Sequence, residues 1–250
     1  MKIFAFIPAR YGSTRFPGKP LAMILGKPMI QHVYERARAC EELTDVFVAT
    51  DDIRIVDCVE SFGGKAVMTS SEHSSGTDRV CEAAGKIGAV SSDIIVNIQG
   101  DQPTFTHGLV SQLLRPLVDD ASVKMSTLRH RIEDTEEINN PNHVKVVTDK
   151  KGFALYFSRH AIPYCREGNS TGVHYKHLGF YCYRMDFLEA FTGMAEGVLE
   201  SLEKLEQLRA LENCIRIMVV ETEFDSVEVD VPEDVEIVEK VLLKEGVQEK

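Results

Sequence analysis

A concentration of cationic side chains follows the first apolar run of the sequence. The segment IPARYGSTRFPGKP, residues 7–20, contains Arg10, Arg15 and Lys19 together with two glycines, one serine and one threonine. Arg and Lys neutralise phosphate oxygens, and glycines let the backbone approach a ligand closely. The spacing matches neither a Walker A loop nor a G-x-G-x-x-G loop. A solvated basic turn is the alternative, but an acidic chain has little reason to concentrate cations here, so we predict a polyphosphate-binding loop.

A second polar segment, HSSGTDR at residues 73–79, precedes a stretch whose apolar residues have helical spacing. Ser75 or Thr77 is a suitable N-cap for that helix. A helix start also offers free backbone N–H groups to a ligand. The two roles are compatible, so the segment is a candidate for both capping and ligand contact.

Two aspartates stand at the ends of other apolar runs. Asp101 lies in NIQGDQP, directly after the most apolar run, and Asp230 lies in VDVPED. A carboxylate at the end of a buried strand is costly unless it is paired or binds a metal. Mg²⁺ is usually held by one or two carboxylates together with substrate phosphates, whereas capping of a turn or helix is the alternative role. We predict that both aspartates hold Mg²⁺ beside a nucleoside triphosphate, in a site for phosphoryl transfer.

Alternating strand-like and helix-like segments must position these loops. Over the first 100 residues, stretches of helical period alternate with short apolar runs at residues 3–7, 46–49, 65–69 and 94–98. This alternation predicts an α/β fold with a mostly parallel central sheet flanked by helices. In an open parallel sheet, ligands bind beyond the carboxyl ends of the strands, which is where the polar segments lie.

The pattern changes after about residue 120. Strand-like runs at 123–131, 143–148 and 153–158 follow one another without clear helices, so we predict a smaller mixed β region. Helical spacing returns over 198–212, where leucines three apart predict a helix with a core-facing stripe. No repeat, low-complexity tract or long linker divides the chain, so we predict one domain over residues 1–250.

The composition disfavours several classes of protein. The 28 Lys and Arg residues against 39 Asp and Glu residues give a formal charge of -11, so nucleic acid is not an expected partner. No uninterrupted apolar run reaches the about 18 residues of a membrane helix, and the first ten residues lack a secretory signal pattern. We therefore expect no membrane association and a cytoplasmic location. Six cysteines without a C-x-x-C pair favour reduced, mostly buried thiols.

Six motifs occur in order along nearly the whole chain, namely IPARYGSTRFPGKPL, SSGTDR, NIQGDQP, KHLGFYCYR, LEKLEQLRALE and VDVPED. In this combination the sequence resembles the 3-deoxy-manno-octulosonate (Kdo) cytidylyltransferases, or CMP-Kdo synthetases. The resemblance implies a fold of the nucleotide-diphospho-sugar transferase type and a homodimer. It also implies that CTP and the sugar acid Kdo are joined to give CMP-Kdo and pyrophosphate for lipopolysaccharide synthesis, with Mg²⁺ as cofactor.

The resemblance further implies roles for individual residues. The phosphates of CTP would be held by Arg10, Ser13, Arg15 and Lys19. The cytosine and ribose would be surrounded by Ala9, Ser75, Gly76 and Gln99. The catalytic set would be Lys19, Asp101 and Asp230, with the two aspartates as Mg²⁺ ligands. The sugar acid would be contacted by Arg159, His177, Tyr181, Glu206 and Gln207, within a region of about residues 120–212 that also forms the dimer contact.

The residue types support the five sugar contacts unequally. Arg159 offers a planar, bidentate fork to the carboxylate of a sugar acid. His177 and Tyr181 are four residues apart in a predicted strand and so share a face, where they are equally suited to packing. Glu206 and Gln207 lie on the predicted leucine-striped helix, where a solvated face is the usual explanation.

One departure from the family resembled concerns residue 102. The family commonly reads QGDEP, whereas this chain has Gln102, which cannot ionise. Enzymes of this family with Gln there are associated with an 8-amino-3,8-dideoxy sugar acid, so Kdo and its 8-amino analogue both stay open as acceptors. Another sugar-nucleotide pyrophosphorylase and a nucleotide-binding regulator without turnover are further alternatives. The paired aspartates argue against the regulator, because a binder needs no catalytic metal.

Overall fold

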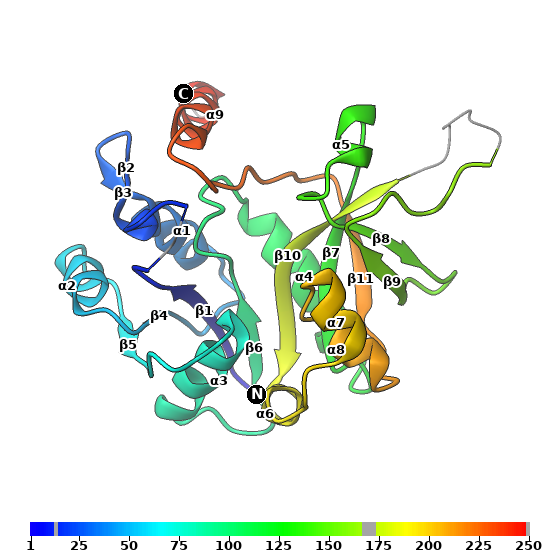
Figure 1. Ribbon diagram of the computed structural model, residues 1–250. Coiled ribbons are helices and arrows are strands. Elements are labelled where there is room, and N and C mark those ends of the chain that lie inside the picture. The colour runs from blue at the N-terminus through cyan, green and yellow to red at the C-terminus, as the bar shows by residue number, and fades with distance from the viewer. Residues whose placement is uncertain (13–14, 167–173, 249–250) are drawn as a thin grey trace. The chain divides into compact units, whose positions relative to one another are not determined.

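The chain folds into two compact units. Figure 1 colours the ribbon by residue number, from blue at the N-terminus to red at the C-terminus. The computed structural model describes residues 1–12, 15–166 and 174–248. Unit 1 comprises residues 1–111 and 225–250, and unit 2 comprises residues 112–224. Helix α4 (His107–Asp119) runs across the sequence boundary between them. Unit 1 is therefore built from two stretches that are far apart in the sequence.

Four parallel strands form the sheet of unit 1. They are β1 (Ile3–Ala9), β4 (Asp45–Thr50), β5 (Ala66–Met68) and β6 (Ile94–Asn97). Strand β1 pairs with β6 along one edge and with β4 along the other, and β4 pairs with β5. All four residues of β6 are buried, as expected of an apolar strand covered on both faces. The predicted parallel α/β arrangement is confirmed.

Three helices alternate with these strands. They are α1 (Met29–Arg38), α2 (Ile53–Ser61) and α3 (Gly76–Lys86). Helix α3 packs against β1 and α1 packs against β4. The N-cap of α3 is Ser75, whose side chain accepts a hydrogen bond from the backbone N–H of Asp78. The capping role considered for Ser75 is thus confirmed, and Thr77 instead lies inside the helix.

A small apolar cluster fastens the C-terminal stretch to the rest of unit 1. Buried Ile24, Met29, Val229 and Val238 pack together in it. Ile24 belongs to the short hairpin β2 (Met23–Ile24) and β3 (Lys27–Pro28), and Val238 belongs to α9 (Asp234–Gln248). Because Val229 is held here, the neighbouring Asp230 is positioned close to the loop after β1.

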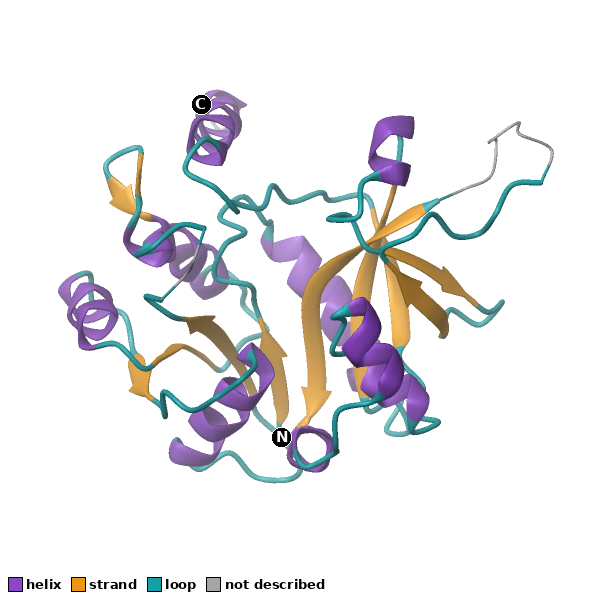
Figure 2. Ribbon diagram, viewed as in Figure 1, coloured by secondary structure: helices purple, strands orange, loops and turns teal. Residues whose placement is uncertain are grey.

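Unit 2 has a mixed sheet, visible among the strands of Figure 2. Its strands are β7 (Met125–Arg131), β8 (Lys145–Thr148), β9 (Ala154–Ser158), β10 (Tyr175–Arg184) and β11 (Met218–Thr222). Strand β7 pairs in parallel with β11 and antiparallel with β10. Strand β8 pairs antiparallel with both β9 and β10. The predicted mixed β region is confirmed; the short helices α5 (Thr135–Asn139) and α6 (Met185–Thr192) also lie in this unit.

The single helix predicted over residues 198–212 is wrong. The structure has two short helices, α7 (Val198–Glu203) and α8 (Leu208–Glu212), because Lys204 adopts a left-handed conformation with a φ of 53°. The leucine stripe is also interrupted. Leu205 and Leu208 are buried, whereas Leu202 is 77% exposed. The turn rotates the two helical faces relative to each other, so the leucines do not form one core-facing row.

Composition led us to expect reduced, mostly buried cysteines and no membrane-spanning helix. All six cysteines are free thiols, but only Cys40 and Cys182 are buried, so the expectation of mostly buried thiols is wrong. Burial raises the pKa of Cys40 to about 12, which makes that thiol a poor nucleophile. Among the described residues, no helix combines the length and the apolar character needed to cross a bilayer.

Candidate active site

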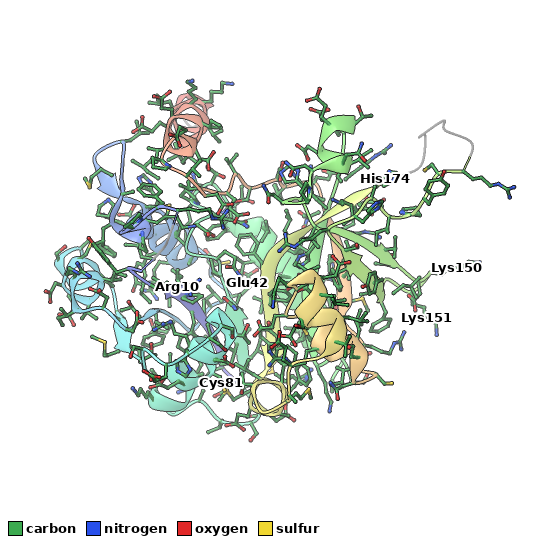
Figure 3. The ribbon with its side chains drawn as sticks, in the orientation of Figure 1. Arg10, Glu42, Cys81, Lys150, Lys151 and His174 are labelled. Atoms are coloured by element: carbon green, nitrogen blue, oxygen red, sulfur yellow. The ribbon has the colours of Figure 1, made fainter. Side chains whose placement is uncertain are left out.

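A cavity of about 280 Å³ opens in unit 1 where β1 and β6 end. The expected nucleotide-binding residues that line this cavity are Ala9, Arg10, Arg15, Lys19, Ser75, Gly76 and Gln99. Asp101 and Asp230 line it as well. Arg10 leaves the end of β1 with an exposed side chain, labelled in Figure 3, and Ser13 lies outside the described residues. The fold thus gathers residues from both ends of the chain around one cavity, as the strand-end rule predicts.

Two glycines permit the close approach of backbone segments at this cavity. A Cβ atom added to Gly100 would lie 3.0 Å from the carbonyl oxygen of Pro8, a backbone atom that cannot move aside easily. Gly18 has a φ of 72°, which an L side chain rarely adopts, and its N–H donates to the carbonyl of Tyr11 at 2.9 Å. The turn at Gly18 closes the cationic loop, and Gly100 lets the segment after β6 pass directly beside β1.

Lys19 lies at the centre of the charged groups. It begins a short 3₁₀ helix (Lys19–Leu21), and its side chain is only 16% exposed. The Nζ atom donates to Asp101 Oδ2 at 2.6 Å and to the Val229 carbonyl at 2.9 Å, and it lies 3.9 Å from Asp230 Oδ1. Arg15 Nη1 contacts Asp230 Oδ2 at 2.8 Å. Lys19 is therefore held by ion pairs and is not a mobile cation on an exposed loop.

A third carboxylate, from Glu228, joins the two aspartates. One carboxylate oxygen from each of Asp101, Glu228 and Asp230 lies within 4.8 Å of the other two. The Val229 N–H donates to the Asp101 carbonyl at 2.9 Å, which ties the two segments together. Glu228 is exposed on the cavity wall, yet desolvation of its carboxylate, and then the charges of Asp101 and Asp230, raise its pKa to about 7. These oxygens form a donor set that suits a hard divalent cation.

Sequence reasoning missed Glu228, although a usable signal was present. Residues 228 and 230 are two apart in an extended segment, so their side chains point to the same side. Val229, between them, is buried in the apolar cluster, as alternation requires. The pattern Val-Glu-Val-Asp at residues 227–230 therefore indicates that the Glu228 carboxylate lies on the same side of the segment as the Asp230 carboxylate.

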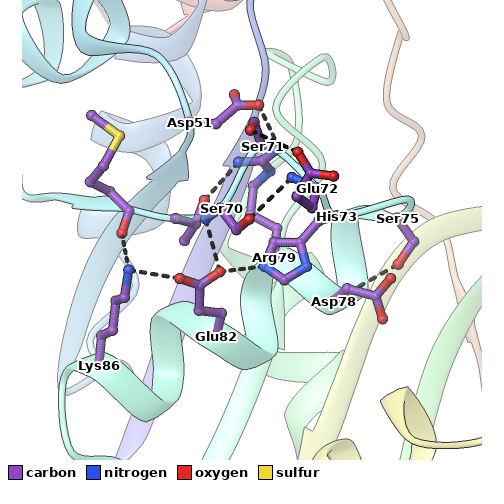
Figure 4. A network of polar contacts seen from close by, with 12 residues as sticks. Asp51, Ser70, Ser71, Glu72, His73, Ser75, Asp78, Arg79, Glu82 and Lys86 are labelled. Carbon is purple, nitrogen blue, oxygen red and sulfur yellow. Dashed lines mark hydrogen bonds and ion pairs between the residues drawn. The ribbon is translucent and has the colours of Figure 1, made fainter.

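The start of α3 carries a dense polar network, drawn in Figure 4. Arg79 is buried, and its guanidinium contacts Asp51 Oδ2 at 3.1 Å and Thr69 Oγ1 at 2.6 Å. The imidazole of His73 contacts the carboxylate of Glu82. His73 and Arg79 both line the cavity, and neither was in the predicted set although both lie in the segment HSSGTDR.

The expected sugar-acid residues all lie in unit 2. Arg159 follows β9, and its guanidinium donates to three backbone carbonyls: Nε to Glu203 at 2.7 Å, Nη1 to Pro141 at 3.0 Å and Nη2 to Lys204 at 3.4 Å. These bonds fix the plane of the guanidinium. Because Arg has five N–H donors, two have no acceptor within residues 1–12, 15–166 and 174–248.

His177 and Tyr181 lie on the same side of β10, as predicted. Their ring centroids are 5.3 Å apart, and the Phe157 ring meets His177 edge-on at 5.1 Å. The irregularity in β10 adds two residues relative to β7, and an even number preserves the alternation of faces. His177 Nε2 contacts Thr127 Oγ1 at 2.9 Å, and burial lowers the pKa of the imidazole to about 3, which keeps it neutral at physiological pH.

Glu206 and Gln207 do not lie on a helical face. They occupy the turn between α7 and α8, and Gln207 is the N-cap residue of α8. Gln207 is only 4% exposed, so the solvated face considered for it is wrong. Burial of the phenol, and then the charge of Glu206, raise the pKa of Tyr181. The turn thus brings Glu206 close to the aromatic residues of β10.

Known proteins match this chain over nearly its full length. Residues 4–217 match a family profile described as cytidylyltransferase. A 3-deoxy-manno-octulosonate cytidylyltransferase from Desulfatibacillum aliphaticivorans is 55% identical over 242 residues, which cover 97% of this chain and 99% of that relative. An 8-amino-3,8-dideoxy-manno-octulosonate cytidylyltransferase from Shewanella piezotolerans is 52% identical over 240 residues, covering 96% and 98%.

A solved structure agrees with these relatives. It is a CMP:2-keto-3-deoxy-manno-octonic acid synthetase in complex with CTP, 44% identical in sequence, with a TM-score of 0.92 over 98% of this chain and 100% of that one. In the present chain, the cations and carboxylates of the sequence motifs line the cavity at the strand ends of unit 1. This chain therefore belongs to the cytidylyltransferase family and is a nucleotidyltransferase.

Proposed function

We propose that the chain joins CTP and a sugar acid of the Kdo type to give the CMP-sugar and pyrophosphate, for lipopolysaccharide synthesis. The observation that carries the proposal is the cavity of unit 1, where Arg10, Arg15 and Lys19 meet two aspartates beyond the ends of parallel strands. The names of two relatives at 55% and 44% identity support the acceptor.

In this reaction the anomeric C2 hydroxyl of the sugar acid attacks the α-phosphorus of CTP. The bond from the α-phosphorus to the oxygen that bridges to the β-phosphate breaks, pyrophosphate leaves with that oxygen, and the proton of the attacking hydroxyl is released to solvent. Arg15 and Lys19 supply positive charge close to the departing group, and positioning plus charge neutralisation provides most of the acceleration in such chemistry. No covalent enzyme intermediate is required.

We also propose that Asp101 and Asp230 hold Mg²⁺, with Glu228 as a further oxygen donor. The three carboxylates fit the ion because their oxygens lie within 4.8 Å of one another and are hard donors. When bound, Mg²⁺ would withdraw charge from the phosphate oxygens and favour loss of pyrophosphate. Lys19 already offsets part of the repulsion among these carboxylates and so keeps the donor set together.

For the acceptor, unit 2 offers a carboxylate-binding fork and a neutral aromatic surface. The two unused N–H donors of Arg159 suit the carboxylate of the sugar acid. Neutral His177 and the phenol of Tyr181 suit its hydroxyl groups. Glu206 and Gln207 add polar groups from the turn beside them.

We propose Kdo as the acceptor and its 8-amino analogue as the alternative, because relatives named for each are 55% and 52% identical. Gln102, the residue that raised this question, is buried next to Asp101 and is not among the residues that line the cavity of unit 1.

We further propose a homodimer and a cytoplasmic location. Helix α7 exposes Val198, Leu199 and Leu202, apolar side chains that a partner subunit would cover. Replacement of Leu202 by Glu is expected to shift the molecular mass measured by light scattering toward that of a monomer. The six free cysteines suit a reducing compartment.

The decisive experiment measures pyrophosphate release with CTP, UTP, GTP or ATP in the presence of Kdo, the 8-amino acid or a sugar phosphate. We expect turnover with CTP and Kdo, and none without an acceptor. Preference for UTP or GTP with a sugar phosphate would identify a different pyrophosphorylase. Binding of CTP without turnover by any sugar acid would instead indicate the regulator.

A further inference from the structure

The wall of the cavity in unit 1 has a charged part and a part without net charge. The cationic loop and residues 228–230 supply the charged part. At the start of α3 the wall contains His73, Ser75 and Gly76, and Arg79 adds a charge that Asp51 balances. With its phosphates in the charged part, a nucleotide would have its base against the part of the wall at the start of α3. The inference below rests on this proposed binding of CTP.

His73 is fixed in the wall by one nitrogen of its ring. Its Nε2 atom contacts the Glu82 carboxylate, and Figure 4 shows the other ring nitrogen on the side of Ser75 and Asp78. Lys86 Nζ contacts the second oxygen of Glu82 at 2.6 Å, and the backbone N–H of Ser70 donates to the first at 2.9 Å. Both carboxylate oxygens are thus held in place.

This arrangement decides which nitrogen of the His73 ring carries the hydrogen. The hydrogen bond with Lys86, and then that with the Ser70 N–H, lowers the pKa of Glu82 to about 2. An ionised carboxylate only accepts hydrogen bonds, so Nε2 must donate. In the neutral imidazole, Nδ1 is then an acceptor on the side of the ring that faces Ser75 and Asp78, two of the residues at the start of α3.

We propose that Nδ1 of His73 accepts a hydrogen bond from the exocyclic amino group of cytosine, and that Glu82 sets the tautomer required for this contact. Cytosine presents an amino donor at position 4 of its ring, whereas uracil presents a carbonyl oxygen there. A bare nitrogen facing that oxygen would bring two acceptors together. His73 is therefore a specificity-determining residue for CTP over UTP, and Glu82 is a positioning residue.

Neighbouring side chains are less suited to this role. The Ser75 hydroxyl oxygen already accepts from the Asp78 N–H at 3.0 Å as the N-cap. Arg79 has donors only, and its guanidinium is engaged by Asp51 and Thr69. Arg79 therefore offers no acceptor to an amino group, and Ser75 retains only one of its two lone pairs beside the capping bond.

The test compares CTP with the 5′-triphosphate of 2-pyrimidinone riboside, which lacks the 4-amino group, and with UTP. Competition binding and kcat/KM are measured for the wild type, His73→Ala and His107→Ala. His107 is an exposed histidine of α4 outside the cavity wall and serves as the control. We expect His73→Ala to reduce the preference for CTP over the 2-pyrimidinone analogue by about tenfold, and the preference over UTP by at least as much.

Because each preference is a ratio within one variant, a loss of folded protein cancels out. Undiminished preference for CTP over the analogue in His73→Ala would overturn the inference while leaving the proposed function intact. Failure of wild-type enzyme to bind CTP would overturn both. The tautomer has its own readout, because the two ring nitrogens differ in ¹⁵N chemical shift: the wild type should show hydrogen on Nε2, and hydrogen on Nδ1 would contradict the proposal. Glu82→Gln should weaken the Nε2 signature and the preference for CTP together.

Discussion

Replacement of Lys19 by Met removes one cation from the wall of the unit 1 cavity while keeping most of the aliphatic stem. The Nζ atom contacts Asp101, the Val229 carbonyl and, at a longer distance, Asp230. Met cannot form these contacts, so Asp101 loses its ion-pair partner, and Asp230 keeps its ion pair with Arg15. We expect both stability and turnover to fall, with the larger effect on turnover.

The magnitude follows from the burial of the lysine. At an effective dielectric constant of about 20, unit charges about 4 Å apart interact by about 4 kcal/mol, most of which is offset by lost hydration. A hydrogen bond to a charged group contributes about 1.5 to 3 kcal/mol net, so Lys19→Met should lower the free energy of unfolding by about 2 kcal/mol, or Tm by about 4 to 8 °C. Loss of a cation beside the transition state should reduce kcat/KM for CTP by about 10² to 10³.

The assay pairs thermal unfolding, with and without Mg²⁺, with pyrophosphate release. Lys27→Met is the matched control, because Lys27 forms an exposed ion pair with Glu35 in the same unit at 2.7 Å and should change stability by about 0.5 kcal/mol or less. Mg²⁺ should raise the Tm of Lys19→Met more than that of the wild type, since the carboxylates then lack Lys19. Wild-type kcat/KM in Lys19→Met, or a Tm loss no larger than that of the control, would refute the reasoning.

Three further outcomes are expected. Asp101→Asn and Asp230→Asn should keep the fold but suppress turnover by orders of magnitude and weaken Mn²⁺ binding measured by electron paramagnetic resonance; near-normal kcat at saturating Mg²⁺ would contradict their role as metal ligands. His177 binds a proton below about pH 6.5 when unfolded but only near pH 3 when folded, so its stabilising contribution is present above pH 6.5 and decreases as the pH falls toward 3. Urea unfolding at pH 7 and pH 5 should show about 2 kcal/mol more loss for the wild type than for His177→Gln, and equal losses would show that the ring is not desolvated. Gln102→Glu places a carboxylate in a buried position and should shift the ratio of kcat/KM between Kdo and its 8-amino analogue, whereas an unchanged ratio would remove Gln102 from acceptor choice.

Local patterns in the sequence were sufficient for the parallel sheet and for the polar segments that meet beyond it. The apolar runs that became β1 and β6 are buried as their composition predicts, and the cations of residues 10–19 follow β1 directly. Burial of a strand requires apolar side chains along its whole length, and such a requirement is visible in the sequence. Asp101 and Asp230 were recognisable for the same reason, because each carboxylate stands where an apolar run ends.

The tertiary structure alone decided which distant groups meet and where local patterns break. Apolar spacing over 198–212 predicted one helix, but Lys204 takes a left-handed conformation that packing around it must support, since a non-glycine residue adopts that conformation only at a cost. Glu228 joins Asp101 although 127 positions separate them in the sequence, the difference between their residue numbers. Periodicity reports which face of a segment is buried, but it carries no information on which remote segment covers that face. The packing of Val229 into an apolar cluster and its bond to the Asp101 carbonyl made that selection, and with it the charge of the site.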